Sequence, residues 1–181
     1  MKLNTLVLFA LMALTMTITS CGEDPIRGCT DAAAESFDPT ATEEDNSCVY
    51  TRDKFLGDYL ADLDCAGILQ LINTEGFALT ISESLSEDVN EVTVSLGNLG
   101  IDLKGIVSGN AINLSAMVEN FPYDPDGDGV PNFFANLTVG GGAVLDEAGE
   151  ILDGALTVGV VAVDTGVMID TDTCAILGVK Q

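Results

Sequence analysis

Three aspartates spaced two residues apart are the clearest candidates for chemistry in this chain. They lie in the segment 124–132, where carboxylates occupy loop positions one, three and five, a glycine occupies position six and a backbone carbonyl follows at position seven. This arrangement of oxygens can surround a hard divalent cation, and three carboxylates this close repel one another without one. The alternative is an acidic hairpin tip whose glycines and prolines only make turns. The spacing predicts a calcium site formed by Asp124, Asp126, Asp128, Val130 and Asn132.

The same segment resembles the calcium loops of thrombospondin type-3 repeats, with Asn132 in place of their last aspartate. Ala135 stands at position twelve, where an EF-hand has a bidentate glutamate. Because the final carboxylate is missing, we expect weak binding, with a Kd on the order of 10⁻⁴–10⁻³ M, as in extracellular modules.

The chain is poorly equipped for catalysis. It has no histidine, so an imidazole-assisted nucleophile and an imidazole-bound zinc ion are excluded. Paired carboxylates of the glycosidase kind stay open, because the chain has 29 acidic residues, but none stands in a recognisable signature. We therefore predict a non-catalytic protein and keep a carboxylate-based hydrolase as an alternative.

The first 20 residues have the layout of a secretory signal peptide. Lys2 precedes an uncharged apolar run, residues 6–14, that is too short to span a bilayer. The run is followed by Ile18, Thr19, Ser20 and Cys21, which together resemble the lipobox of bacterial lipoproteins. That resemblance implies cleavage before Cys21 and acylation of this residue, which anchors the protein to a membrane without a transmembrane helix. The alternative is an ordinary signal peptide with a chance cysteine at the cleavage site.

The acidic residues that follow Cys21 are similar to surface-export signals of Bacteroidetes lipoproteins. The resemblance therefore implies attachment to the bacterial outer membrane, on its periplasmic or its cell-surface face.

The charge of the protein limits its partners. The formal net charge is −23, and removal of Lys2 with residues 1–20 changes it to −24. Such a charge excludes nucleic acids and anionic lipid surfaces as attractive partners and favours divalent cations. The alternative is that the acidic residues form only a solvated coat suited to saline surroundings.

Five cysteines are present, and four remain if Cys21 carries lipid. An even number in an oxidising compartment predicts two disulfides, for which three pairings are possible. We favour Cys29 with Cys48 and Cys65 with Cys174, because the first pair brackets a short polar segment and the second brackets nearly all of the apolar sequence.

The segment 21–50 is acidic and has almost no periodic apolar residues, so it cannot bury enough apolar surface to fold without a cross-link such as a disulfide. Between Gly28 and Tyr50 it resembles a cysteine-bracketed GCTD repeat of secreted Bacteroidetes proteins, which acts as a spacer. A cation held by the acidic side chains of this segment is an alternative; they are Asp31, Asp38, Glu44 and Asp45.

From residue 51 to the end, apolar and polar residues alternate in short runs, as in half-buried strands. One run holds Phe77, Leu79 and Ile81, and two others, 101–107 and 112–118, flank a tight turn at residues 108–110 and predict a hairpin. Seven to nine such strands, with no long helical pattern, predict an all-β domain, an antiparallel meander closed as a barrel or folded as a sandwich. The segment 66–74 fits either a strand or one or two helical turns.

The domain also resembles a family of small lipocalin-like domains of Bacteroidetes. The resemblance rests on an opening that runs from Asp53 to Tyr59, in which Gly57-x-Tyr59 stands where lipocalins have Gly-x-Trp, and on a last strand that contains Thr173 and Cys174. In a closed meander the first and last strands are neighbours, so Cys65 and Cys174 would staple the seam.

Three classes of function follow. We expect a calcium-stabilised structural or adhesive domain or a binding module. A carrier of a small apolar or amphipathic ligand is the first alternative, and a hydrolase is the second. A carrier requires a hollow interior, which small inward residues such as Gly105, Ala116 and Gly159 could provide.

Overall fold

The computed structural model describes residues 24–66, 74–97, 100–123, 130 and 133–181. Eight strands form a closed barrel in the order β10-β3-β4-β5-β6-β7-β8-β9, and every neighbouring pair is antiparallel. This confirms the predicted all-β meander and selects the barrel over the sandwich. The strands are β3 Gly57–Cys65, β4 Thr74–Glu83, β5 Glu91–Leu96, β6 Ile101–Ser108, β7 Ala111–Tyr123, β8 Phe133–Leu145, β9 Ile151–Ala162 and β10 Met168–Lys180.

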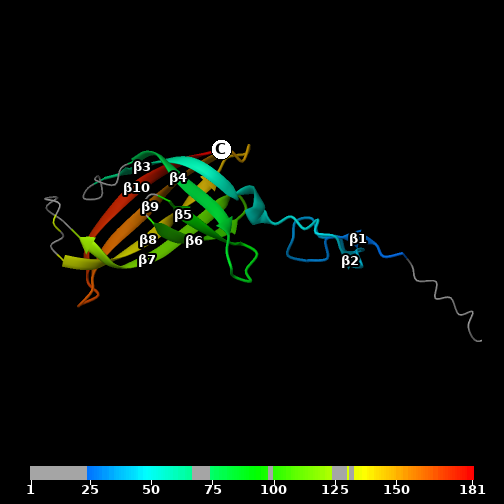
Figure 1. Cartoon of the computed structure of the whole chain (residues 1–181), viewed down its shortest axis with the longest axis horizontal. Helices are drawn as coiled ribbons and strands as arrows, with labels where there is room; N and C mark the ends of the chain where they lie inside the picture. Colours follow the sequence, from blue (N-terminus) through cyan, green and yellow to red (C-terminus); the bar gives the residue numbers. More distant parts are fainter. Residues whose placement is uncertain (1–23, 67–73, 98–99, 124–129, 131–132) are drawn as a thin grey trace, which may run out of the picture.

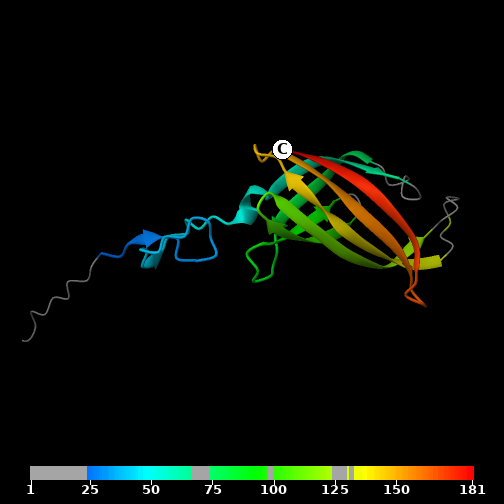
Figure 2. The same cartoon turned by 180° about the vertical axis from the view of Figure 1, so that it is seen from behind.

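A small module precedes the barrel. Two short parallel strands, β1 Arg27–Gly28 and β2 Glu43–Glu44, lie outside the barrel in Figure 1 and Figure 2. The Cys29–Cys48 disulfide closes this module. A 3-10 helix, η1 (Thr51–Lys54), then leads into β3.

The core follows from the alternation in the sequence. Along β3 and β5 every second residue is buried, and the residues between them are exposed or half-buried. In β4, the predicted inward set Phe77, Leu79 and Ile81 is at most 2% exposed. The period of two thus places one apolar face of each strand inside the barrel.

The first and last strands of the barrel meet at a stapled seam. In the ladder between β3 and β10, Cys65 lies directly opposite Cys174, and the two form a disulfide. Both predicted disulfide pairings are therefore confirmed.

The two ends of the barrel differ. We call the end that carries η1 and the turns 84–90, 109–110 and 146–150 the closed end. We call the opposite end, where β3, β5, β7 and β9 finish, the mouth. In both views the module lies beyond the closed end, and the turn between β9 and β10 lies at the mouth (Figure 1 and Figure 2).

Strand β7 is longer than the sequence pattern predicts. We expected its inward alternation to end at Val118, but the strand continues to Tyr123 after a bulge between Val118 and Phe121. Asn120 has a φ of 54° in this bulge. The extra residue moves the inward positions from even to odd numbers, so a strict period of two ends there although the strand does not.

The closed end is filled by aromatic rings. Phe55, directly after η1, is 0% exposed, and Tyr59 is 2% exposed. The Tyr59 hydroxyl donates a hydrogen bond of 2.8 Å to the Phe55 carbonyl. Lys180, at the end of β10, donates to the Lys54 carbonyl at 3.0 Å, and its Nζ lies 5.8 Å from the centre of the Tyr59 ring. These contacts thus connect η1 to β10 beside the packed aromatic side chains of the closed end.

Candidate functional site

An apolar cavity of about 90 Å³ lies inside the mouth half of the barrel. Its walls come from inward positions of seven strands. The lining residues are Leu63, Leu96, Ile101, Leu103, Phe121, Leu137, Val139, Leu156, Val158 and Cys174. None of these ten carries an acid, a base or a free nucleophile, because Cys174 is in a disulfide. The walls can therefore accept an apolar group and offer no catalytic chemistry.

The cavity does not lie beside the small residues that were expected to leave space, Gly105, Ala116 and Gly159. At Gly105, a Cβ atom would lie 2.7 Å from Cδ1 of Ile112 and 2.8 Å from Cγ2 of Val92. This glycine therefore admits larger neighbours, which fill the space, and does not create a hollow. The expectation that Gly105 opens the interior is wrong.

Gly159 and Ala116 do not line the cavity either. Val158 and Val160 are the inward residues on β9, so Gly159 points outward, where a Cβ atom would lie 2.8 Å from the Met168 sulfur. Ala116 is half-buried and packs against the core. The prediction failed at Gly159 because this part of β9 is apolar on both faces, so the sequence did not show which face is inward.

Two carboxylates stand beside the cavity on β10. Asp172 is 6% exposed and pairs in the ladder with Val158, while Asp170 is half-buried and pairs with Val160. Both alternate with outward threonines and share the inward face with Cys174. The sequence analysis missed them, although the alternation Asp-Thr-Asp-Thr-Cys carries the signal.

Tyr123, on β7, adds a phenol to this end of the barrel. Burial is the largest cause that raises the pKa of Tyr123, followed by the charge of Asp170 and a hydrogen bond to its carboxylate. We call Asp170, Asp172 and Tyr123 the polar lip.

The outer wall carries an apolar stripe near the closed end. Leu60 on β3, Val179 on β10, Ile151 on β9 and Val144 on β8 are each 42–55% exposed. Leu60 lies opposite Val179, and Val179 lies opposite Ile151. We call these four residues the wall stripe. The exposed carboxylates of Asp62 and Asp153 lie beside it, since Asp62 follows Leu60 by two residues on β3 and Asp153 pairs with Val144.

The acidic residues of the module hold its turns. Asp31, Asp38 and Asp45 each accept a hydrogen bond from the backbone N–H two residues later, at 2.8–3.0 Å. Glu44 accepts from the N–H of Thr30 at 2.9 Å and from that of Asn46 at 2.8 Å. These contacts give the carboxylates a structural role.

The hydrogen bonds also shift the titration of these groups. The Ala33 N–H holds the pKa of Asp31 below its ordinary value, the Thr40 hydroxyl does the same for Asp38, and the Thr30 N–H does so for Glu44. Because the pKa values in the folded state are depressed, these hydrogen bonds contribute their full stabilisation above the ordinary carboxylate pKa. That stabilisation is lost as the pH falls through the depressed values.

Glu44 also lies near both sulfurs of the Cys29–Cys48 pair. Because the two sulfurs are joined in a disulfide, neither is a thiolate, and the group is not a metal site in this oxidised form.

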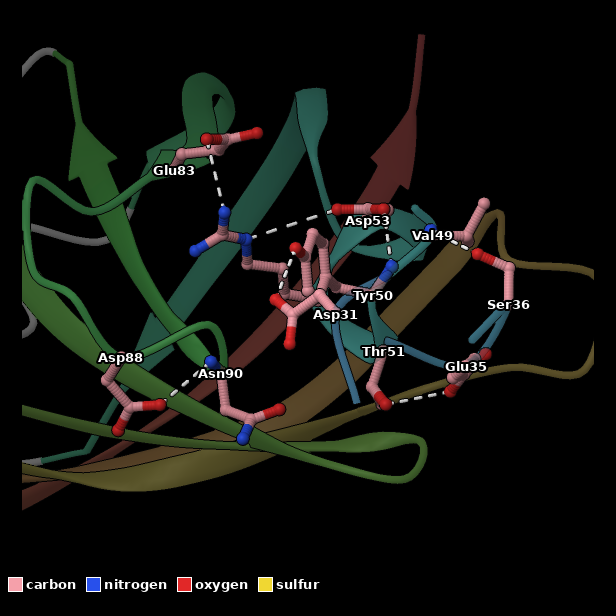
Figure 3. A network of polar contacts seen from close by, with 11 residues as sticks. Asp31, Glu35, Ser36, Val49, Tyr50, Thr51, Asp53, Glu83, Asp88 and Asn90 are labelled. Carbon is pink, nitrogen blue, oxygen red and sulfur yellow. Dashed lines mark hydrogen bonds and ion pairs between the residues drawn. The ribbon is translucent and has the colours of Figure 1, made fainter. Parts of the chain in front are cut away.

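A polar network joins the module to the closed end of the barrel (Figure 3). The Tyr50 hydroxyl donates to Asp31 at 2.8 Å, and the Thr51 hydroxyl donates to Glu35 at 2.7 Å. Arg52 is buried, donates to Glu83 at 3.2 Å and stacks 5.4 Å over the Tyr50 ring. The network holds the module at the end opposite the cavity.

The sequence-predicted metal and lipid sites lie almost entirely outside the described residues. This applies to Asp124, Asp126, Asp128 and Asn132 of the expected calcium loop, to Cys21, and to residues 67–73 of the ambiguous segment. Of the calcium set, only Val130 is described, as an exposed residue in a bend. Thr74 begins β4.

Comparisons with protein-family models, with curated proteins and with solved structures each gave no match. Within the part of the chain that the structure describes, no helix has both the length and the apolar character needed to cross a membrane.

Proposed function

We propose that this chain is a lipid-anchored, non-catalytic binding protein whose barrel takes up the apolar end of a small ligand. The observation that carries the proposal is the apolar cavity in the mouth half. Its volume of about 90 Å³ is smaller than the ~150 Å³ apolar cavity that binds benzene. It therefore suits the end of a short apolar chain and is too small for a bulky ring system.

The position of the module supports this function. The chain enters the barrel at the closed end through η1, and the network around Arg52 connects the module to that end. An anchor at Cys21 would thus place the closed end towards the membrane and leave the mouth accessible.

The binding test uses 1-octanol as the probe and the oxidised full chain carrying Cys21→Ser. We expect saturable binding in calorimetric titrations. Val139→Phe should fill the cavity and raise the Kd at least about tenfold, which corresponds to a loss of about 1.4 kcal/mol of binding free energy. Val144→Phe is the matched control, because it is the same change on the same strand but on the exposed outer wall. Equal binding by both variants would count against the cavity as the site.

The lipid anchor is a separate part of the proposal. Cys21→Ala should abolish incorporation of labelled fatty acid and release the protein from membranes. Unchanged membrane labelling would contradict it. Protease treatment of whole cells distinguishes a cell-surface position, where the barrel is cut, from a periplasmic one, where it is protected.

Calcium binding at residues 124–132 is likewise proposed from the sequence. A ligand that binds only the folded form stabilises it by about 2.7 kcal/mol at a hundredfold excess over Kd. Millimolar calcium should therefore raise the melting temperature by several degrees over chelator. The double change Asp126→Asn with Asp128→Asn should abolish the rise. No change in the wild-type protein would show that the loop is only an acidic turn.

A second function, docking of a protein partner, is favoured by the wall stripe. Its bordering carboxylates select a partner whose apolar contact residues are flanked by Lys or Arg. A synthetic amphipathic peptide with that pattern should bind the wild type and the Val139→Phe variant equally and should lose affinity for Val179→Glu. Retention by Val179→Glu would exclude the stripe.

A further inference from the structure

The polar lip and the cavity form one continuous inner surface. On β10, Asp172 precedes the cavity-lining Cys174 by two residues, and its ladder partner Val158 also lines the cavity. Asp170 is the next inward-facing residue of β10 in the direction of the mouth. A ligand whose apolar end fills the cavity would therefore have its other end beside these carboxylates.

Both carboxylates are held by backbone hydrogen bonds, and that of Asp172 is shielded from water. Asp172 is 6% exposed and accepts the Thr173 N–H at 2.8 Å. Asp170 is half-buried and accepts the Thr171 N–H at 2.8 Å. Because charge interactions are stronger away from bulk water, a charged group placed here would be attracted or repelled more than at the outer surface.

We propose that this site selects amphipathic cations, which place an apolar chain in the cavity and an ammonium or similar group beside Asp170 and Asp172. The inference rests on the proposed apolar-binding function and adds the charge of the ligand. Anionic amphiphiles such as fatty acids are disfavoured, because their carboxylate would meet two others in a chain with a net charge of −23.

The test compares three probes with the same chain length: octyltrimethylammonium, 1-octanol and octanoate, each below its micelle concentration. The protein is the oxidised full chain carrying Cys21→Ser. We expect the cation to bind about tenfold more tightly than the alcohol at low salt, with octanoate weakest, and we expect this preference to fall as salt is added.

Variants separate the polar lip from the general acidity of the chain. Asp170→Asn with Asp172→Asn keeps the hydrogen-bond acceptors and should bring the cation-to-alcohol ratio close to one. Glu87→Gln removes one charge from the exposed turn 84–90 at the closed end, away from the cavity and the wall stripe, and should leave the ratio unchanged. If the double variant does not fold, Asp170→Asn alone should lower the ratio severalfold, since Asp170 is half-buried and nearer the mouth.

The outcomes are distinguishable. Equal binding of cation and alcohol, or a cation preference that survives in the folded lip variants, overturns the charge selection and leaves the apolar site in place. A preference that Glu87→Gln lowers as much as Asp170→Asn does would assign it to net charge and also overturn the inference. Failure of all three probes to bind overturns both the proposed function and this inference.

Discussion

The closed end and the mouth of the barrel are built from the same alternating strands, yet only the closed end is filled. At the closed end, the rings of Phe55 and Tyr59 are buried, and Gly105 lets Ile112 and Val92 pack closely. At the mouth, Phe121 is half-buried, and the aliphatic side chains around it leave the cavity. Alternation therefore determines which side chains enter a barrel, whereas their size determines whether they meet across it.

This difference separates stability from binding. The closed end carries the tie between Lys180 and η1 and the junction with the module. The mouth carries the cavity, the polar lip and the Cys65–Cys174 staple. We expect changes of packed side chains at the closed end to alter mainly the free energy of unfolding, and changes of the cavity walls and the polar lip to alter mainly ligand affinity. The disulfide at the mouth is the exception, because it acts on stability.

The largest expected effect is loss of the staple at the mouth. The Cys65–Cys174 disulfide joins residues 109 positions apart, and in the chain-entropy model such a link contributes about 4–5 kcal/mol. Changing both cysteines to Ser should lower the free energy of unfolding in guanidinium titrations by that order. The control is the corresponding change of Cys29 and Cys48, which should affect the barrel little. A loss under about 1 kcal/mol for the Cys65 and Cys174 pair would contradict the prediction.

The next effect comes from a matched pair of phenylalanines. Phe55→Ala should cost about 3–5 kcal/mol, because it empties a fully packed site. Phe121→Ala should cost less than half of that, because the Phe121 side chain already lines a cavity and is partly exposed to solvent. Urea unfolding curves measure both. Equal losses would mean that the two ends are packed alike.

Lys180→Met should cost about 1–2 kcal/mol. The change keeps most of the side-chain length but removes the charged donor to the Lys54 carbonyl and the cation over the Tyr59 ring. Arg27→Met is the control, because it breaks an ion pair with Glu43 in which both side chains are exposed, and such pairs contribute about 0–1 kcal/mol. Thermal melts should rank the two variants in this order, and the reverse ranking would refute the role of the tie.

Tyr59→Phe should have the smallest effect at neutral pH, about 1 kcal/mol for one hydrogen bond. Burial raises the pKa of Tyr59 to about 12. Because this folded value is above the ordinary ~10, the neutral phenol contributes stability below pH ~10 that is lost as the pH rises through about 12. In an absorbance titration of the three tyrosines, Tyr59→Phe should remove the step at the highest pH. Persistence of that step in the variant would place it on Tyr50 or Tyr123.

The sequence alone was sufficient for the strand pattern and for the disulfides. The period of two in runs such as Phe77, Leu79 and Ile81 needs only that one face of a strand be buried, which is a local property. The pairing of Cys65 with Cys174 followed from the contrast between a polar and an apolar segment and from the neighbouring first and last strands of a meander. Both rest on information that is present along the chain.

The binding site could not be obtained in this way. Its walls come from seven strands, and whether Val139 and Leu63 meet across the interior depends on barrel closure and on the bulge at Asn120. The inward side of β9 at Gly159 was undecidable because both faces there are apolar. The inward position of Asp172 was readable in the alternation of β10, but its place beside a cavity was not. A cavity depends on distances between residues far apart in the chain, and only the tertiary structure determines those distances.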